Sequence, residues 1–177
     1  MSSEQGSGIW ITGLPASGKS SVARELALRL RDRGLPVVVL ESDMLRKVLT
    51  PFPSYSEEER DRFYGMLIGI GDLITRNGVT VIFDATANRR AYRDSARSMI
   101  PRFIEVFIDC PLEVCRARDP KGIYAQAASG APGTVPGVQA TYEPPLQPEV
   151  VMDCRSTPSE GAELVLRKIR ELGLLPV

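Results

Sequence analysis

The chain has 177 residues, of which 43% are hydrophobic, and this is enough to bury one globular core. Its 22 basic and 22 acidic residues cancel, so no excess of positive charge indicates a nucleic acid partner. No apolar run is long enough to predict a membrane span. The absence of histidine excludes histidine-based catalysis and histidine metal sites, so a general base must be a carboxylate, lysine, tyrosine or cysteine.

The N-terminal part of the chain carries the strongest motif. Residues 1–7 are polar, and we expect a loose tail rather than a targeting signal. An apolar strand over 8–12 then leads into a loop and a helix that starts at Lys19. The loop matches G-x-x-x-x-G-K-[ST] at Gly13, Gly18, Lys19 and Ser20.

This phosphate loop predicts binding of a nucleoside triphosphate. Its glycines allow a tight turn, and its N–H groups and the following helix N-terminus point at anionic oxygens. The lysine reaches the outer phosphates and the serine hydroxyl binds Mg²⁺. We therefore expect ATP and Mg²⁺ as ligands. The expected ATP-binding residues in the loop are Gly13, Leu14, Pro15, Ala16, Ser17, Gly18, Lys19, Ser20 and Ser21.

The rest of the chain alternates between apolar runs and helical patterns. The further predicted strands are 35–42, 79–83, 102–108 and 149–152, and the further predicted helices lie near 56–76, 89–99, 111–118 and 158–172. Strands separated by helices predict an α/β fold, a five-stranded parallel sheet covered by helices on both faces. We expect a single domain over 8–177.

Polar residues follow the predicted strands, where open parallel sheets bind their ligands. Glu41 and Asp43 follow the second strand, with Arg46 one turn later. Two carboxylates there can hold Mg²⁺ waters or accept a proton, and the arginine can pair with phosphate or sulfate. The alternative is a helix N-cap at Ser42 or Asp43 beside a surface arginine, and the sequence leaves both open.

The third strand ends in a similar way. Asp84 follows it, as a ligand of Mg²⁺ water does in many nucleotide-binding proteins, and Thr86 and Asn88 come next. Arg89, Arg93 and Arg97 follow at a spacing of four residues. We expect a solvated basic face, from which one or two arginines reach a substrate.

Residues 119–148 are rich in Gly, Pro and Ala and have no strong period. A loop this long in a compact domain predicts a mobile lid that excludes water from phosphoryl transfer. Arg116, Arg118 and Lys121 lie at its entrance. They either stabilise charge on the transferred group or complement a helix C-terminus.

The cysteines Cys110, Cys115 and Cys154 form no CxxC pair and have apolar neighbours. They predict buried thiols in a reducing cytoplasm rather than a metal or disulfide set.

Three stretches together resemble the adenylylsulfate kinase family: GLPASGKSSVARELALRL, FIEVFIDCPLEVCRARDPKGIYAQA and GVQATYEPPLQPEVVMDC. The resemblance covers Trp10 to about Leu172. It implies a P-loop kinase fold with a mobile lid and often a homodimer. It also implies transfer of the ATP γ-phosphoryl group to the 3′-hydroxyl of adenosine 5′-phosphosulfate (APS), a small-molecule acceptor.

The resemblance assigns roles to individual residues. Asp43 matches the family's catalytic base, Glu41 a neighbouring carboxylate, and Arg46 and Arg60 substrate-binding arginines. The catalytic set is then Lys19, Asp43 and Arg118, with Arg118 also binding ATP. The Mg²⁺ set is Ser20, Glu41 and Asp84. The substrate-binding set is Glu41, Asp43, Arg46, Tyr55, Arg60, Phe63, Thr86, Lys121 and Val135.

The departures from the family pattern lie on the acceptor side. Phe63 replaces an asparagine, and Val135 stands where a lid phenylalanine stacks on the acceptor's adenine. We therefore expect weaker acceptor binding than with the full motif. The segment FDATANRR is also similar to a segment of small-metabolite kinases, which leaves a kinase for another hydroxyl metabolite as the alternative. A nucleotide-binding module without kinase activity is the third reading.

Overall fold

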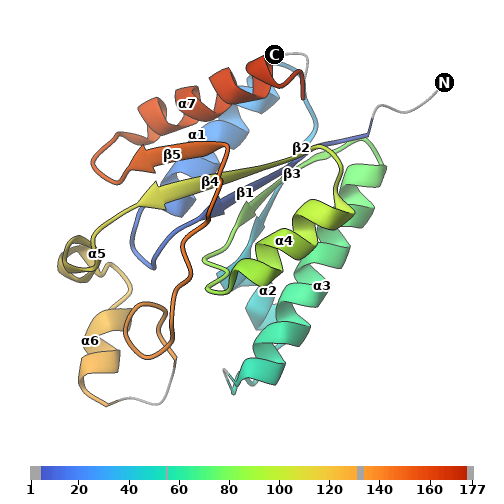
Figure 1. The fold of residues 1–177 in the computed structure, drawn as a ribbon. Coiled ribbons are helices and arrows are strands. Elements are labelled where there is room, and N and C mark those ends of the chain that lie inside the picture. Colours follow the sequence, from blue (N-terminus) through green and yellow to red (C-terminus); the bar gives the residue numbers. More distant parts are fainter. Residues whose placement is uncertain (1–4, 55, 131–133, 175–177) are drawn as a thin grey trace.

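The computed structural model describes residues 5–54, 56–130 and 134–174. Within them the chain forms five strands and seven helices (Figure 1). The strands are β1 (Gly8–Thr12), β2 (Val37–Glu41), β3 (Thr80–Asp84), β4 (Phe103–Asp109) and β5 (Val150–Asp153). The helices are α1 (Lys19–Asp32), α2 (Ser42–Leu49), α3 (Glu57–Arg76), α4 (Arg90–Met99), α5 (Leu112–Arg118), α6 (Ile123–Ala128) and α7 (Pro158–Glu171).

The strands form one parallel sheet in the order β2-β3-β1-β4-β5. Helices α1 and α7 lie side by side on one face, and α3 and α4 cover the other (Figure 1). Each face has its own apolar core, because residues of β1, β3 and β4 point alternately into the two helix layers. The predicted α/β fold is confirmed.

The sequence gives clear reasons for these elements. Every residue of β1 and β3 is buried, which explains why both read as continuous apolar runs. Helix α3 is capped by Ser56, whose side chain accepts a hydrogen bond from the Glu59 N–H, and α7 begins with a capping box of Thr157 and Glu160. The ends of the predicted elements lie within two residues of the observed ones.

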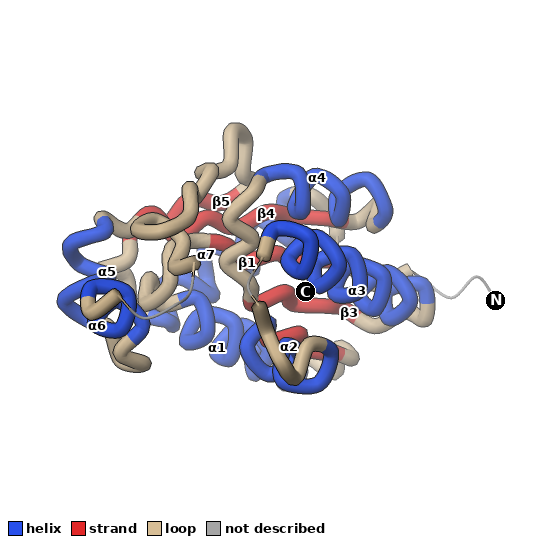
Figure 2. The backbone as a smooth tube through the Cα atoms, turned by 90° about the horizontal axis from the view of Figure 1, so that it is seen from below, coloured by secondary structure: helices blue, strands red, loops and turns tan. Residues whose placement is uncertain are grey.

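Two short helices were not among those predicted. Helix α2 starts directly after β2, and its N-cap is Glu41, so the helix that was left open as an alternative begins earlier than a cap at Ser42 or Asp43 would place it. Helix α6 has six residues inside the expected loop 119–148 and buries only Tyr124. In both views α5 and α6 lie next to each other at one end of the molecule (Figure 1, Figure 2).

Ser7, the last residue of the expected loose tail, is packed against the fold. Ser7 is buried, and its Oγ donates a hydrogen bond to the Leu174 carbonyl, so packing begins before β1. The three cysteines are free thiols and are buried, as expected. Along the described chain, no helix combines the length and the apolar composition that a membrane crossing requires.

Candidate active site

The phosphate loop joins β1 to α1 in the conformation that its glycines predict. Gly13 and Gly18 have φ of 152° and 108°, and Ala16 has φ of 62°, a left-handed conformation that a residue with a Cβ adopts at a cost. The Lys19 ammonium donates to the carbonyls of Gly13 at 3.1 Å and Leu14 at 2.8 Å. Burial lowers the pKa of Lys19, and the carboxylates of Asp84 and Asp43 oppose this effect.

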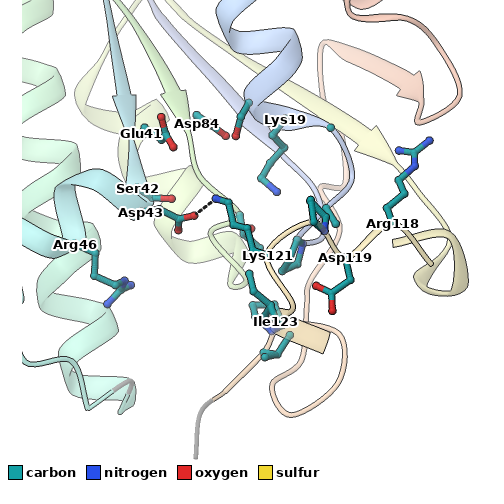
Figure 3. Close-up of a pocket in the computed structure, with 18 of the residues that line it drawn as sticks. Lys19, Glu41, Ser42, Asp43, Arg46, Asp84, Arg118, Asp119, Lys121 and Ile123 are labelled. Carbon is teal, nitrogen blue, oxygen red and sulfur yellow. Dashed lines mark hydrogen bonds and ion pairs between the residues drawn. The ribbon is translucent and has the colours of Figure 1, made fainter. Parts of the chain in front are cut away.

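A cavity of about 850 Å³ lies beside this loop, within the range of small-molecule sites. It opens at the carboxyl ends of the strands, where Figure 3 shows carboxylates and cations facing one another. The predicted residues that line it are Pro15, Ala16, Gly18, Lys19, Ser20, Ser21, Glu41, Asp43, Arg46, Arg60, Asp84, Thr86, Arg118, Lys121 and Val135. The topology thus gathers residues from five separate segments of the chain, 15–21, 41–46, 60, 84–86 and 118–135.

Two carboxylates face the cavity from neighbouring strands. Glu41 and Asp84 are register partners at the ends of β2 and β3, and Asp84 is buried. With the Ser20 hydroxyl they supply oxygen donors, which suit Mg²⁺. In the described part of the chain, no three Cys, Asp or Glu side chains are arranged to hold a metal alone. These donors therefore fit an ion that keeps waters and binds phosphate oxygens.

The segment 119–148 closes the cavity from the opposite side through two polar contacts. Lys121 Nζ lies 2.5 Å from Asp43 Oδ2, in the first turn of α2 (Figure 3). This hydrogen bond raises the pKa of Lys121. Arg60 of α3 donates to the Thr134 carbonyl at 2.5 Å and also to the Thr134 hydroxyl. The segment thus reaches both α2 and α3.

Arg46 is held in place on the acceptor side. Its guanidinium donates to Glu59 Oε1 at 2.7 Å and lies 4.0 Å from the centroid of the Phe63 ring. Phe63 itself is fully buried and does not line the cavity, which corrects its assignment as a substrate-binding residue. Its ring supports Arg46 from behind. Tyr55 lies outside the described residues.

Arg118 lies between the main cavity and a smaller one of about 230 Å³. Its guanidinium donates to the Cys154 carbonyl at 2.8 Å and points away from Asp43 and Lys121 (Figure 3). The smaller cavity is also lined by Ser17, whose Oγ is buried without a hydrogen-bond partner, and by the segment 152–156. The phosphate loop thus borders two cavities, the main one and this smaller one.

Other predicted residues lie away from the main cavity. Gly13 and Leu14 do not line it but bind Lys19 through their carbonyls. The prediction of a solvated basic face on α4 is wrong for Arg93. This residue is 1% exposed, and its Nε lies 2.6 Å from Glu105 Oε1. Asn88 is buried as well.

The cavity also has lining residues that sequence reasoning missed. They are Arg24, Ser42, Tyr64, Asp119, Pro120, Ile123, Gln126, Ala127, Thr134, Pro136 and Gln139. Most belong to 119–148, where no periodicity indicates which side chains point inward.

Comparison with known proteins shows which family the chain belongs to. The family model for adenylylsulphate kinase matches residues 5–153. A probable adenylyl-sulfate kinase of Pyrococcus abyssi is 43% identical over 173 residues, covering 97% of this chain and 99% of that protein. An adenylyl-sulfate kinase of Rippkaea orientalis is 39% identical over 175 residues, covering 97% and 96%.

A solved structure is similar in three dimensions. The Mycobacterium tuberculosis APS kinase, in complex with AMPPNP and APS, superposes with a TM-score of 0.89 at 32% identity, covering 94% of this chain and 98% of that one. Sequence and fold thus agree, and the chain belongs to the adenylylsulphate kinase family.

Proposed function

We propose that the chain transfers the γ-phosphoryl group of ATP to the ribose 3′-hydroxyl of APS, giving 3′-phosphoadenosine 5′-phosphosulfate and ADP. Family membership supports the reaction, and so does the similarity to a structure that holds an ATP analogue together with APS. One observation about the chain itself carries the proposal. A phosphate loop faces a carboxylate, Asp43, and a lid lysine, Lys121, across one cavity.

The ATP phosphates would bind in the phosphate loop. Lys19 is bonded to two loop carbonyls in the structure, and an anionic phosphate is a stronger partner for its ammonium. The N-terminus of α1 favours negative charge at the same place. The smaller cavity beyond Ser17 and Arg118 suits the nucleoside part of ATP, because it is continuous with the loop.

Ser20, Glu41 and Asp84 would hold Mg²⁺, whose charge neutralises the phosphate oxygens during transfer. Glu41 and Asp84 are adjacent at the strand ends, so each can accept a hydrogen bond from a water on the ion. This arrangement leaves Asp43, in the first turn of α2, for the acceptor hydroxyl.

Asp43 would orient the 3′-hydroxyl or accept its proton. A positioned carboxylate of this kind contributes about 10²- to 10⁴-fold to the rate. Arg46 and Arg60 both line the acceptor side and would pair with the phosphosulfate end. Val135 lines the cavity but offers no aromatic face, whereas stacking on a base is worth about 1–3 kcal/mol. We therefore propose weaker acceptor binding than in an enzyme with an aromatic residue there.

Single-turnover transfer tests the assignment. Wild-type protein should convert APS with a higher kcat/KM than sugar, nucleoside or amino-alcohol acceptors. Asp43→Asn should slow transfer to APS by about 10²-fold or more. Glu41→Gln is the matched control. Its loss of transfer rate should become smaller when the Mg²⁺ concentration is raised. If Asp43→Asn is as fast as wild type, another group is the base. If another acceptor is preferred, the chain acts on a different hydroxyl metabolite.

We also propose a homodimer in a reducing cytoplasm. The free, buried thiols suit such a compartment. Val48 and Phe52 are 75% and 95% exposed near the end of α2, and their association would remove apolar surface from water. Light scattering of the wild-type protein and of Phe52→Ser distinguishes a dimer through this surface from a monomer.

A further inference from the structure

A buried hydroxyl connects the two sides of the cavity. Thr12 is the last residue of β1, immediately before the phosphate loop, and is 0% exposed. Its Oγ1 lies 2.6 Å from the Thr86 carbonyl and 3.0 Å from Tyr142 Oη. Because a carbonyl only accepts, the Thr12 hydroxyl donates to Thr86, and Tyr142 must then donate to Thr12. Burial raises the pKa of Tyr142 to about 12, so its hydroxyl keeps the proton at neutral pH.

The loop that receives this bond, residues 85–88, is strained. Ala87 has φ of 43°, a left-handed conformation that is unfavourable for a residue with a Cβ. Its N–H donates to Tyr64 Oη at 2.9 Å, and its carbonyl accepts from Arg93 Nη1. Neither bond belongs to a strand or helix. Side chains from α3 and α4 therefore hold this loop in shape.

The same loop is fastened to the segment that carries Tyr142. Arg93 Nη2 donates to the Glu143 carbonyl at 2.6 Å, while its Nε is bonded to Glu105. The Glu143 N–H donates to the Asn88 carbonyl at 2.7 Å, and the Asn88 amide donates to the Thr141 carbonyl at 3.1 Å. Several hydrogen bonds thus hold the segment 141–143, and they fix the position of Tyr142 next to Thr12.

We propose that Thr12 and Tyr142 are positioning residues for phosphoryl transfer. Their hydrogen-bond chain fixes the acceptor-side loop 85–88 relative to the phosphate loop. Thr86 lines the cavity, while Thr12 and Tyr142 do not. The distance between the donor phosphate and the acceptor hydroxyl then depends on this shared hydroxyl, together with the two bonds of Ala85 to β1, from Trp10 Nε1 to its carbonyl at 3.0 Å and from its N–H to the Ile11 carbonyl at 3.4 Å. A displacement of about 1 Å in such a site lowers transfer by about 10²-fold.

The test compares two Thr12 variants and rests on the proposed function for its kinetic part. Thr12→Val keeps the shape and removes the hydroxyl, whereas Thr12→Ser keeps the hydroxyl. Thr12→Val should slow single-turnover transfer to APS at least 10-fold, with the ATP dissociation constant within twofold of wild type. Thr12→Ser should stay within threefold of wild type in both measurements. Equal losses in the two variants, or a parallel loss of ATP affinity, would overturn the proposal.

A double variant tests whether the hydroxyls act as one chain. Tyr142→Phe should slow transfer, and Thr12→Val/Tyr142→Phe should be no slower than Thr12→Val alone, because the second bond has already lost its partner. Losses that multiply would show independent roles and contradict the proposal. Arg93 is less suitable, because its removal takes the 2.6 Å partner from the buried Glu105, leaves that carboxylate with Arg97 Nη2 at 3.7 Å, and can unfold the protein.

Amide hydrogen exchange in the ligand-free protein gives a readout that does not depend on the acceptor. Thr12→Val should speed exchange across 85–88 at least fivefold and leave exchange across α1 unchanged. Unchanged exchange at 85–88 would show that Thr12 does not hold this loop, even if the variant transferred the phosphoryl group slowly. If wild type fails to phosphorylate APS, the proposed function fails, while this exchange measurement still decides whether Thr12 holds the loop.

Discussion

Substitution of Phe63 by leucine tests how the chain prepares its acceptor side. The Phe63 ring is fully buried beneath Arg46, whose guanidinium carbon lies 4.0 Å from the ring centroid. Leucine keeps an apolar side chain in the core but removes the aromatic face. We expect the KM for APS to rise and kcat to change little, because Asp43 and the phosphate loop do not contact this ring.

The size of the expected rise in KM follows from the contact between the Phe63 ring and Arg46. The arginine side chain is 13% exposed, and a cation–π contact at such a partly desolvated site is worth about 1–2 kcal/mol. Glu59 still pairs with Arg46 in the variant, so the loss is limited to the cost of re-ordering the side chain on binding. That cost is about 0.5–1.5 kcal/mol, or about 2- to 12-fold in KM.

Phe103→Leu is the matched control. Phe103 is also buried under an arginine, with the Arg97 guanidinium carbon 5.1 Å from its ring centroid, but it lies at the start of β4, at the sheet edge opposite the cavity. Both variants should lose stability, by about 0.5–3 kcal/mol as for most core changes. Steady-state kinetics with APS as the varied substrate separates them. An unchanged KM in Phe63→Leu, or an equal rise in Phe103→Leu, would refute the reasoning.

Four further outcomes are expected. Lys19→Ala should lower turnover at least 100-fold while circular dichroism stays that of the wild type, because the ammonium binds phosphate and not the core. Lys121→Gln should lower kcat by about 10²-fold. It should change the free energy of unfolding in urea by less than about 1 kcal/mol, since its pair with Asp43 is more than half exposed. Ala16→Gly should raise the melting temperature by a few degrees, because relief of about 1–2 kcal/mol of left-handed strain exceeds the added entropy of the unfolded chain. Hydrogen exchange across 119–148 should slow when ATP analogue and APS bind together, and exchange that is already slow without ligand would contradict a mobile lid.

The fold and the phosphate loop were predictable because their signals are local. The glycines, Lys19 and Ser20 lie within eight residues, and each strand is mostly apolar, although β4 carries Glu105 in its middle. The strand-end carboxylates were predictable for a geometric reason. Parallel strands bring Glu41 and Asp84 to one edge of the sheet wherever they stand in the sequence.

Other features depend on tertiary partners that the sequence does not indicate. Phe63 and Tyr64 are neighbours on α3 and are both buried, yet only Tyr64 lines the cavity, because the rotation of the helix decides which side chain reaches it. Arg93 has the spacing of a solvated face, but Glu105 on β4 offers a buried partner from a distant part of the sequence. The inward side chains of 119–148 were unpredictable because this segment has no period.

The polar pairs that line the cavity bear on how the site avoids wasting ATP. The Lys19 ammonium is bonded to loop carbonyls, Lys121 to Asp43, and Arg46 to Glu59. Each substrate anion therefore replaces an existing partner rather than meeting a bare cation. If Asp43 orients the acceptor hydroxyl as proposed, Lys121 has to leave it first, and the γ-phosphoryl group would be the anion that draws this lysine away. We infer that Asp43 is released from Lys121 when ATP is bound and the lid has moved. Water alone then does not meet a free Asp43 carboxylate beside the γ-phosphoryl group, and ATP is not hydrolysed.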